Sequence, residues 1–380
     1  MLRCTSFYDS STAANAVVTN NALSSVLFLN SSTAATATLT NVVLGSQIGF
    51  TDSSTASHAT LNNTNSVTYV LFGGTSTADH AFINNFNNAG FSGGALDFYE
   101  QSTAGNATIP NNGAISFSSN STAGNAVITN QKFGTVTFTG SASGGSASVD
   151  NKIGGLVHLR WAATADDLTI VNESGAHVDI SDFLSATTPS VGVGSLSGAG
   201  NIFLGNRNLG LGALNQNDPI SGIVADGGLF GGTGGSLTET GTGSLTLTGA
   251  NTFTGTTAIN AGTLFVNGSL ANGVVAVNSG GTLGGAGVIG GAVTVNSGGI
   301  LAPGNSSGTI TVGGLTLNSS SILNYQLGTP GTVGGGVNDL TIVNGNLTLA
   351  GGTLNIAGLT GFGTGTYRLI NYTGTLTGVR

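Results

Sequence analysis

One pattern constrains the fold of this chain more than any other feature. Five columns of similar residues recur through its first 172 positions, at intervals of 19 to 26 residues. Each copy carries an aliphatic residue, a phenylalanine, an alanine, a second aliphatic residue and an asparagine at nearly constant spacing. A unit of about 22 residues cannot bury its own apolar face, so it must stack on its neighbours to build a core. The register therefore predicts a solenoid.

Each copy contains two short segments in which apolar residues alternate with Thr, Ser or Val, which is the pattern of half-buried strands. Stacked coils place equivalent residues above one another, about 4.8 Å apart. We therefore expect a phenylalanine ladder inside, and an asparagine ladder at one turn where stacked amides hydrogen-bond along the axis. The predicted ladder residues are Asn20, Asn41, Asn63, Asn85, Asn111, Asn130, Asn151 and Asn172, together with Phe7, Phe28, Phe50, Phe72, Phe98, Phe117 and Phe138. An insertion between Phe86 and Gly94 is expected to protrude as a loop.

The second half of the chain repeats in a different, glycine-rich style. It holds 48 of the 65 glycines, and residues 275–283 (VAVNSGGTL) return 18 positions later as residues 293–301 (VTVNSGGIL). Glycine allows sharp corners between short strands because it adopts positive φ at little cost. We therefore divide the chain into β-helix coils of about 22 residues (1–172), a junction with irregular coils (173–234), Gly-rich coils (235–327) and C-terminal coils (328–380). The last part begins with a loop, 328–338, that is flexible by composition.

The charge content excludes several classes of function. Charged residues make up 6% of the chain, and 15 acids against 7 bases give a net charge of -8. A nucleic-acid-binding surface needs a basic face, so no nucleic-acid partner is expected. No apolar run approaches the roughly 18 residues of a membrane-spanning helix.

One group of acids resembles the site of a carbohydrate-active enzyme. Polysaccharide lyases and glycosidases need paired carboxylates, or an acid cluster that binds Ca²⁺ beside a base. The alternative, which we favour, is a solvated acidic turn at the junction. The residues concerned are Asp166, Asp167, Asp179 and Asp182, with Lys152 and Arg160 about one coil earlier.

Two histidines occupy one repeat column on adjacent coils. His58 and His80 would stack about 4.8 Å apart, close enough to share a metal ion, and Asp79 adjoins the second. Other coils carry Asn or Thr in this column, so we interpret it as a turn position that accepts small polar groups. The Gly-x-Gly-x-x-Gly match at 285–290 has no helix after it, and residues 334–342 match a Ca²⁺-binding nonapeptide poorly. We therefore predict no catalytic residue, no metal site and no cofactor.

Residues 235–264 (GSLTETGTGSLTLTGANTFTGTTAINAGTL) closely resemble the autotransporter-associated β-strand repeat, a repeat of bacterial passenger regions. The segments at 194–201 (GSLSGAGN) and 299–306 (GILAPGNS) resemble what precedes and follows that repeat. The resemblance covers about residues 191–320, and Glu239 stands where the family often carries a basic residue. It implies a secreted, right-handed parallel β-helix displayed on the surface of a Gram-negative-type bacterium.

The resemblance also implies a function and partners. It indicates a surface-exposed or secreted passenger that acts as a non-catalytic structural stalk or adhesin, with cell-surface, matrix or glycan ligands. Such passengers normally follow a signal peptide and precede an outer-membrane β-barrel. We recognise neither, and expect the chain to be a fragment. Two alternatives stay open: a β-helical polysaccharide lyase or glycosidase, and an inert spacer that holds a missing N-terminal domain.

Overall fold

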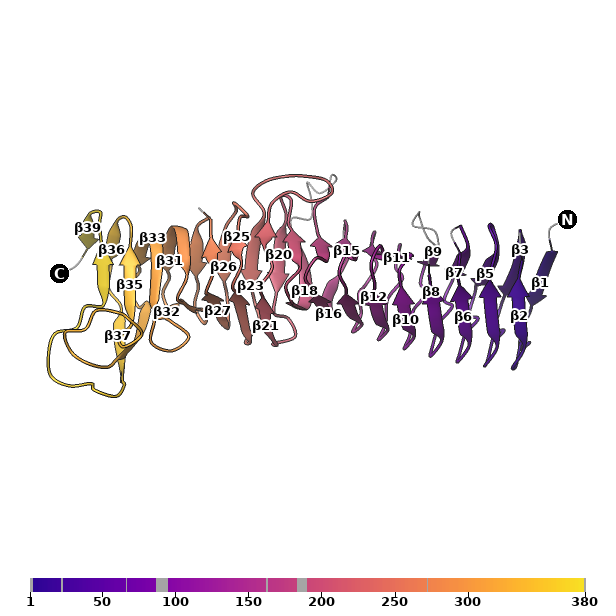
Figure 1. Cartoon of the computed structure of the whole chain (residues 1–380), viewed down its shortest axis with the longest axis horizontal. Coiled ribbons are helices and arrows are strands. Elements are labelled where there is room, and N and C mark those ends of the chain that lie inside the picture. Colours follow the sequence, from indigo (N-terminus) through magenta and orange to yellow (C-terminus); the bar gives the residue numbers. More distant parts are fainter. Residues whose placement is uncertain are drawn as a thin grey trace. The chain divides into compact units, whose positions relative to one another are not determined.

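The computed structural model is built of β-strands throughout the part of the chain that it describes, which comprises residues 3–21, 23–65, 67–86, 95–161, 163–182, 190–271 and 273–378. Strands from successive coils pair in parallel and in register (Figure 1). This confirms the predicted all-β parallel β-helix. The predicted insertion lies largely outside the described residues, since 87–94 are not among them.

Contacts divide the chain into two compact units, Met1–Val193 (the N-terminal unit) and Gly194–Arg380 (the C-terminal unit). The boundary falls inside the junction that the sequence analysis placed at 173–234. Among the described residues, no helix is long and apolar enough to span a bilayer.

In the N-terminal unit each coil contributes one strand to each of two parallel sheets. Their inward positions are apolar and buried, as the alternation predicts. The Phe sheet, whose first seven strands end in phenylalanine, contains β1 (Arg3–Phe7), β3 (Ser24–Phe28), β5 (Gln47–Phe50), β7 (Tyr69–Phe72), β9 (Ala95–Phe98), β11 (Ala114–Phe117), β13 (Thr135–Phe138), β15 (Leu156–Leu159) and β17 (His177–Asp179). The Asn sheet, whose strands end in asparagine, contains β2 (Val17–Asn20), β4 (Thr38–Asn41), β6 (Thr60–Asn63), β8 (Phe82–Asn85), β10 (Thr108–Asn111), β12 (Val127–Asn130), β14 (Ser148–Asn151) and β16 (Ala165–Asn172).

The repeated Ser-Thr-Ala turn joins the two sheets, and its threonine has two roles. The Thr33 backbone forms parallel bridges with Thr12 below and Thr55 above, so the turns themselves stack. The Thr33 hydroxyl accepts a hydrogen bond from the Ala35 N–H at 3.0 Å. This side-chain turn holds Ala35 at a φ of +51°, a conformation that the following coils also adopt and that Gly105 fills later in the array.

The phenylalanines stack inside this unit as a continuous ladder. From Phe7 to Phe138, neighbouring ring centroids lie 4.6–4.9 Å apart and the ring planes differ by 4–9°. The rings are fully buried from Phe28 onward. The coil spacing sets this separation, and each ring between the two ends of the ladder therefore removes a large apolar area from water while contacting an identical neighbour on both sides.

The asparagines form a second ladder at the turn that follows the Asn sheet. Each side-chain amide from Asn20 to Asn151 donates through Nδ2 to Oδ1 of the next ladder asparagine, at 2.7–3.3 Å. Each also donates to a backbone carbonyl at the start of a Phe-sheet strand, as Asn41 does to Tyr69 at 2.9 Å. All eight residues are at most 4% exposed. The buried amides at the corner thus find hydrogen-bond partners within the protein, both along the ladder and on the backbone.

The C-terminal unit has the same parallel stacking with more irregular coils. One row of strands contains β20 (Asn208–Leu211), β23 (Ser236–Glu239), β26 (Thr257–Ile259), β29 (Val275–Val277), β31 (Val288–Val295), β33 (Thr309–Leu317), β36 (Leu347–Leu349) and β39 (Leu376–Gly378). The groove sheet, named for the hollow described below, contains β21 (Asn217–Ile220), β24 (Ser244–Leu247), β27 (Thr263–Val266), β30 (Thr282–Gly285), β32 (Ile300–Pro303), β34 (Ile322–Leu327) and β37 (Thr353–Gly358). The remaining side of each coil is formed by short strands, namely β19 (Asn201–Phe203), β22 (Val224–Ala225), β25 (Ala250–Asn251), β28 (Ser269–Leu270), β35 (Leu340–Val343) and β38 (Ile370–Tyr372). Strand β18 (Ser190–Ser197) includes residues of both units.

Stacked asparagines recur in the C-terminal unit nearer the surface. Asn278 donates to Asn260, Asn296 to Asn278 and Asn318 to Asn296, at 2.7–2.9 Å. The loop expected to be flexible, 328–338, is held by the buried Asn338. Its amide accepts from the Gly328 N–H and donates to two carbonyls inside the loop.

Removing one rung of the buried asparagine ladder should destabilise the N-terminal unit strongly. Asn130 accepts from Asn111 and donates to Asn151 and to the Leu156 carbonyl. Asn130→Ala removes all three bonds and leaves the buried Asn151 Oδ1 without its donor. We therefore expect a loss of about 2–4 kcal/mol in the free energy of unfolding, measured by urea denaturation.

Asn125→Ala is the matched control for this experiment. Asn125 lies on an exposed turn, where its amide donates only to Asn106 at 3.1 Å, and its loss should cost less than about 0.5 kcal/mol. Equal midpoints for the two variants would contradict a stabilising role for the ladder.

Candidate functional site

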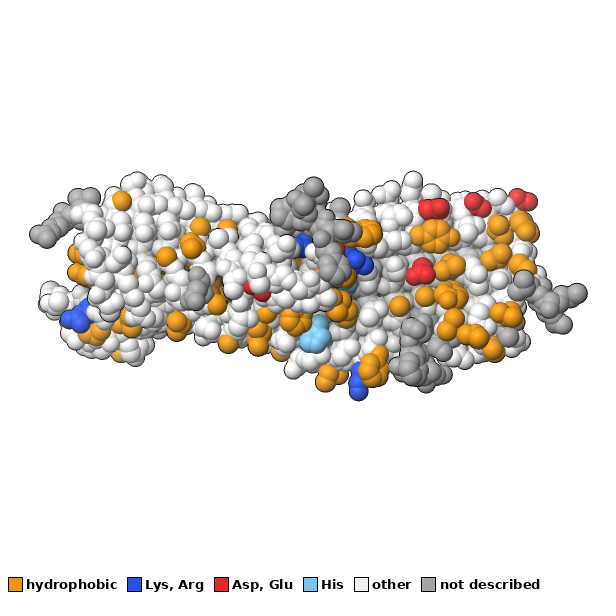
Figure 2. Space-filling model, turned by 90° about the horizontal axis from the view of Figure 1, so that it is seen from above, with side chains coloured by type: hydrophobic (Ala, Val, Ile, Leu, Met, Phe, Trp, Pro, Cys, Tyr) orange, Lys and Arg blue, Asp and Glu red, His pale blue; other side chains and the backbone are white. Residues whose placement is uncertain are grey.

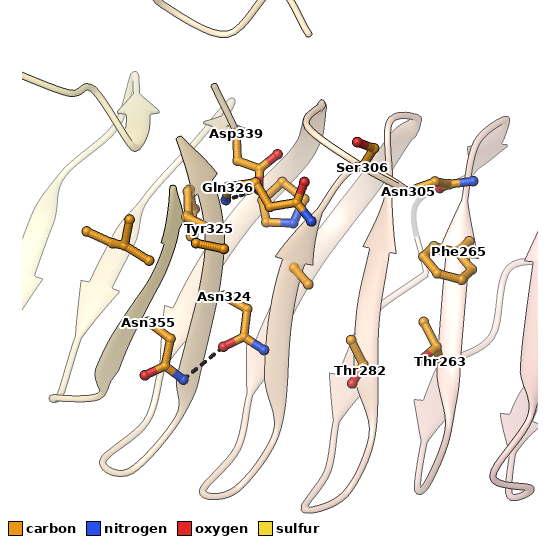
Figure 3. Close-up of a pocket in the computed structure, with 15 residues that line it drawn as sticks. Thr263, Phe265, Thr282, Asn305, Ser306, Asn324, Tyr325, Gln326, Asp339 and Asn355 are labelled. Atoms are coloured by element: carbon orange, nitrogen blue, oxygen red, sulfur yellow. Dashed lines mark hydrogen bonds between the residues drawn. The ribbon is translucent and has the colours of Figure 1, made fainter. Parts of the chain in front are cut away.

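A hollow lies on the outer face of the groove sheet, within the described part of the molecule. It is an open groove of about 490 Å³, which we call the sheet groove (Figure 3). Outward side chains of strands β27, β30, β32, β34 and β37 form its floor, and the turn after β32 forms one wall. Its lining comprises Thr263, Phe265, Thr282, Ala302, Pro303, Gly304, Asn305, Ser306, Asn324, Tyr325, Gln326, Asp339, Asn355, Ile356 and Ala357.

The floor of the groove is recessed because small residues follow Phe265 at the equivalent outward position of the next two coils. Phe265 pairs with Gly284, and Gly284 with Ala302, in successive coils. Glycine is required at 284, because a Cβ there would lie 2.9 Å from the Phe265 ring. The aromatic ring therefore lies against the backbone of the next coil and borders a floor made by Gly284 and Ala302.

The wall is a tight turn anchored by a buried carboxylate. Gly304 has a φ of +84°, and any Cβ there would collide with the Ser306 carbonyl, so the turn requires glycine. Asp339, which is 1% exposed, accepts from the Gly308 N–H at 2.8 Å and from the Gln326 N–H at 2.6 Å. Burial raises the pKa of Asp339, and these backbone bonds partly oppose that shift. The carboxylate thus fixes the turn to strand β34.

Neutral polar side chains line the rest of the groove. Thr263 pairs with Thr282 across neighbouring coils, and Asn324 pairs with Asn355. The Asn355 amide donates to Asn324 Oδ1 at 2.9 Å (Figure 3). Hydroxyl and amide groups therefore recur along the stacking direction at the spacing of the coils, about 4.8 Å.

The structure separates the four aspartates that the sequence analysis grouped. Asp166 and Asp167 are exposed on β16, whereas Asp179, the last residue of β17, and Asp182, which follows that strand, are buried. Asp179 accepts from both the backbone N–H and the hydroxyl of Ser181, at 2.8 and 2.6 Å. The two buried carboxylates therefore hold backbone in place.

The bases expected near these acids have other environments. Lys152 contacts Asp150 and Glu173 at 2.6 Å each, and these hydrogen bonds raise its pKa. Arg160 lies 4.0 Å from Asp182. His158, which was not predicted as a site residue, lies 3.4 Å from the Ser181 carbonyl, and burial lowers its pKa.

The two histidines stack as the shared column predicts. The ring centroids of His58 and His80 lie 5.0 Å apart and their planes differ by 4°. His80 Nδ1 lies 2.7 Å from Asp79 Oδ1, and His58 Nδ1 lies 3.2 Å from the Ser57 hydroxyl. Two coils further on, Asn125 donates to Asn106 in the same column. Within the described residues no three His, Cys, Asp or Glu side chains are grouped as metal ligands.

Two buried acids of the C-terminal unit, Glu239 and Asp218, were not predicted as buried from the sequence. Glu239 occupies an inward position between Leu211 and Ile259, and Asp218 occupies one beside Leu245. Both are at most 3% exposed. Burial, reinforced by the charge of Asp218, raises the pKa of Glu239 to about 8. Burial also raises the pKa of Asp218, although the Ser195 hydroxyl donates to it at 2.6 Å.

The surface around these sites carries little charge. Figure 2 shows uncharged polar and hydrophobic side chains over most of the visible face, with isolated acidic and basic groups. The sheet groove follows this pattern. Among its described lining residues Asp339 is the one acidic residue, and there is no lysine or arginine.

Two comparisons relate this chain to known proteins. The model of the Passenger-associated-transport-repeat family matches residues 237–266, a stretch that includes Glu239 and Phe265. The chain is also 57% identical to the Adhesin BmaC autotransporter of Brucella suis biovar 1 (strain 1330) over 81 residues, which are 20% of this chain and 2% of that protein. The chain thus spans a small part of this relative's length. The predicted resemblance to an autotransporter passenger region is confirmed.

The buried acid pair predicts a stability that falls as the pH rises. The pKa of Glu239 is about 8 in the folded state and near 4.5 in the unfolded chain. The unfolded chain therefore loses its proton first, and the folded state is penalised progressively between pH 4.5 and 8, with no further loss above. Glu239→Gln removes the penalty, so it should stabilise the protein by about 2–4 kcal/mol at pH 8 and hardly at all at pH 4.5.

Thermal unfolding across pH 4–9 measures this difference. Glu173→Gln is the control, because Glu173 lies at the surface against Lys152 and its loss should shift stability by less than about 1 kcal/mol. A Glu239→Gln profile that runs parallel to the unmodified protein from pH 4.5 to 8 would contradict the assignment.

Proposed function

We propose that this chain is part of a surface-exposed autotransporter passenger and acts as a rigid, non-catalytic adhesive stalk. Support comes first from the passenger repeat at 237–266 and from the similarity to a protein named as an autotransporter adhesin. The location that follows from this proposal is the surface of a Gram-negative-type bacterium.

The ladders are the single structural observation that carries the stalk role. Stacked phenylalanines fill the inside of the N-terminal unit, and stacked asparagine amides close its corner. Every coil contacts its neighbours through the same groups, so stability increases with each added coil. Such an array holds its outer faces at fixed positions, which suits repeated weak contacts with a surface.

The carboxylates favour binding over catalysis. A glycosidase needs two carboxyl groups facing one cleft across the bond to be cut. Here Asp179 and Asp339 accept hydrogen bonds from backbone N–H groups, and Asp166 and Asp167 lie exposed on a strand. We therefore assign the buried Asp179 and Asp339 to the fold, and assign the outer faces to recognition.

An adhesion assay tests this proposal directly. Beads coated with the purified chain should bind host cells or extracellular matrix several-fold above beads coated with albumin, and soluble chain should compete for the binding. A spacer would leave the two kinds of bead equal, and that result would overturn the adhesive role.

Surface exposure is tested separately. An antibody raised against residues 1–380 should label intact cells of the source bacterium as strongly as permeabilised cells. Labelling restricted to permeabilised cells would contradict display at the surface.

A further inference from the structure

We propose that the sheet groove binds an uncharged polysaccharide, with the glycan chain lying along the stacking direction of the coils. The inference rests on the proposed function, because it names the class of ligand that one adhesive face recognises. The shape of the groove, the chemistry of its lining and the environment of its carboxylate carry it.

The shape suits a chain molecule rather than a small compact ligand. The groove is open, has a volume of about 490 Å³ and crosses the outer faces of five consecutive strands, β27, β30, β32, β34 and β37. These strands are spaced about 4.8 Å apart, which is close to the length of one pyranose residue in an extended glycan. Successive sugars would therefore meet successive coils in the same relative position.

The hydrogen-bonding groups are neutral and can both donate and accept. Thr263 and Thr282 present hydroxyls, and Asn324, Gln326 and Asn355 present amides. An amide can make four hydrogen bonds, and the contact from Asn355 to Asn324 uses one donor and one acceptor. Sugar hydroxyls, which also donate and accept, match such groups better than a phosphate or a carboxylate does.

The carboxylate beside the groove is engaged by the protein itself. Both Asp339 oxygens accept backbone hydrogen bonds, from Gly308 and Gln326, and the residue is 1% exposed. It is therefore not placed to attract a cationic ligand or to act as a general acid. With no lysine or arginine among the described lining residues, the groove also offers no partner to a sulfate or a uronate.

An aromatic ring borders the groove. The half-buried Phe265 ring lies against Gly284, beside the low floor that Gly284 and Ala302 make. The C–H face of a pyranose packs on an aromatic ring, and a few polar groups then fix its orientation. Strands β30, β32 and β34 pair with a neighbour on both edges, so their backbone groups are not available to a peptide that adds as a strand.

Binding to defined oligosaccharides tests the proposal. The full chain is titrated calorimetrically with neutral hexasaccharides (cellohexaose, mannohexaose and maltohexaose) and with charged ones (oligogalacturonate and a heparin fragment). Ala302→Arg places a bulky side chain on the groove floor. Ala276→Arg is the matched control, because Ala276 takes an outward position in β29, on a different sheet of the same unit.

At least one neutral hexasaccharide should bind, and Ala302→Arg should weaken its binding by about tenfold or more while Ala276→Arg leaves it unchanged. Circular dichroism confirms that both variants fold. No binding of any neutral hexasaccharide up to millimolar concentration, tighter binding of the charged ones, or equal binding by the two variants would overturn the inference. Adhesion of coated beads without neutral-glycan binding would overturn this inference alone, whereas glycan binding without adhesion would overturn the proposed function alone.

Discussion

The N-terminal unit depends on one constraint: a side chain of its internal ladders must be able to stack on a copy of itself, one coil spacing away. Phenylalanine satisfies it by parallel ring stacking, and asparagine by amide hydrogen bonds along the row. The asparagine ladder does more, because its amides also supply partners to buried carbonyls at the corner between two sheets. Without its ladder partners, a buried asparagine amide at this corner would lose hydrogen bonds that water could not replace, at a cost of about 1–3 kcal/mol for each group left unsatisfied.

The same constraint explains the charge content. Like charges in one column would repel each other at every coil, so the columns are filled by Thr, Asn and apolar residues, and charged residues make up 6% of the chain. Glu239 and Asp218 break the rule by replacing aliphatic residues of inward columns. The raised pKa of each shows how the interior resolves the conflict, since a protonated carboxyl is the form that burial favours.

The sequence was informative wherever a residue acts through its column. The ladder positions of Asn63 and Phe72 could be predicted because identical residues recur in register, and recurrence at the length of one coil indicates stacking. Glu239 was noticed as unusual, but its burial could have been inferred only by aligning it with Leu211 and Ile259 in coils of unequal length.

The sheet groove was missed for a similar reason. It depends on Phe265 standing in the same column as Gly284 and Ala302, and on a turn that Asp339 anchors from a later part of the chain. Asp179 and Asp182 required a correction of another kind. The predicted solvated acidic turn holds for the exposed Asp166 and Asp167, whereas Asp179 and Asp182 are buried, which their proximity in sequence could not reveal.

The asparagine ladder of the N-terminal unit has a direction. Every link from Asn20 to Asn172 runs from an amide N–H to the oxygen of the residue that follows along the chain. Each coil therefore offers the same donor on one side and the same acceptor on the other. A whole coil can be duplicated or deleted and the new neighbours still match, whereas a partial coil leaves a mismatched join. Arrays of this kind can change length during evolution in steps of one repeat.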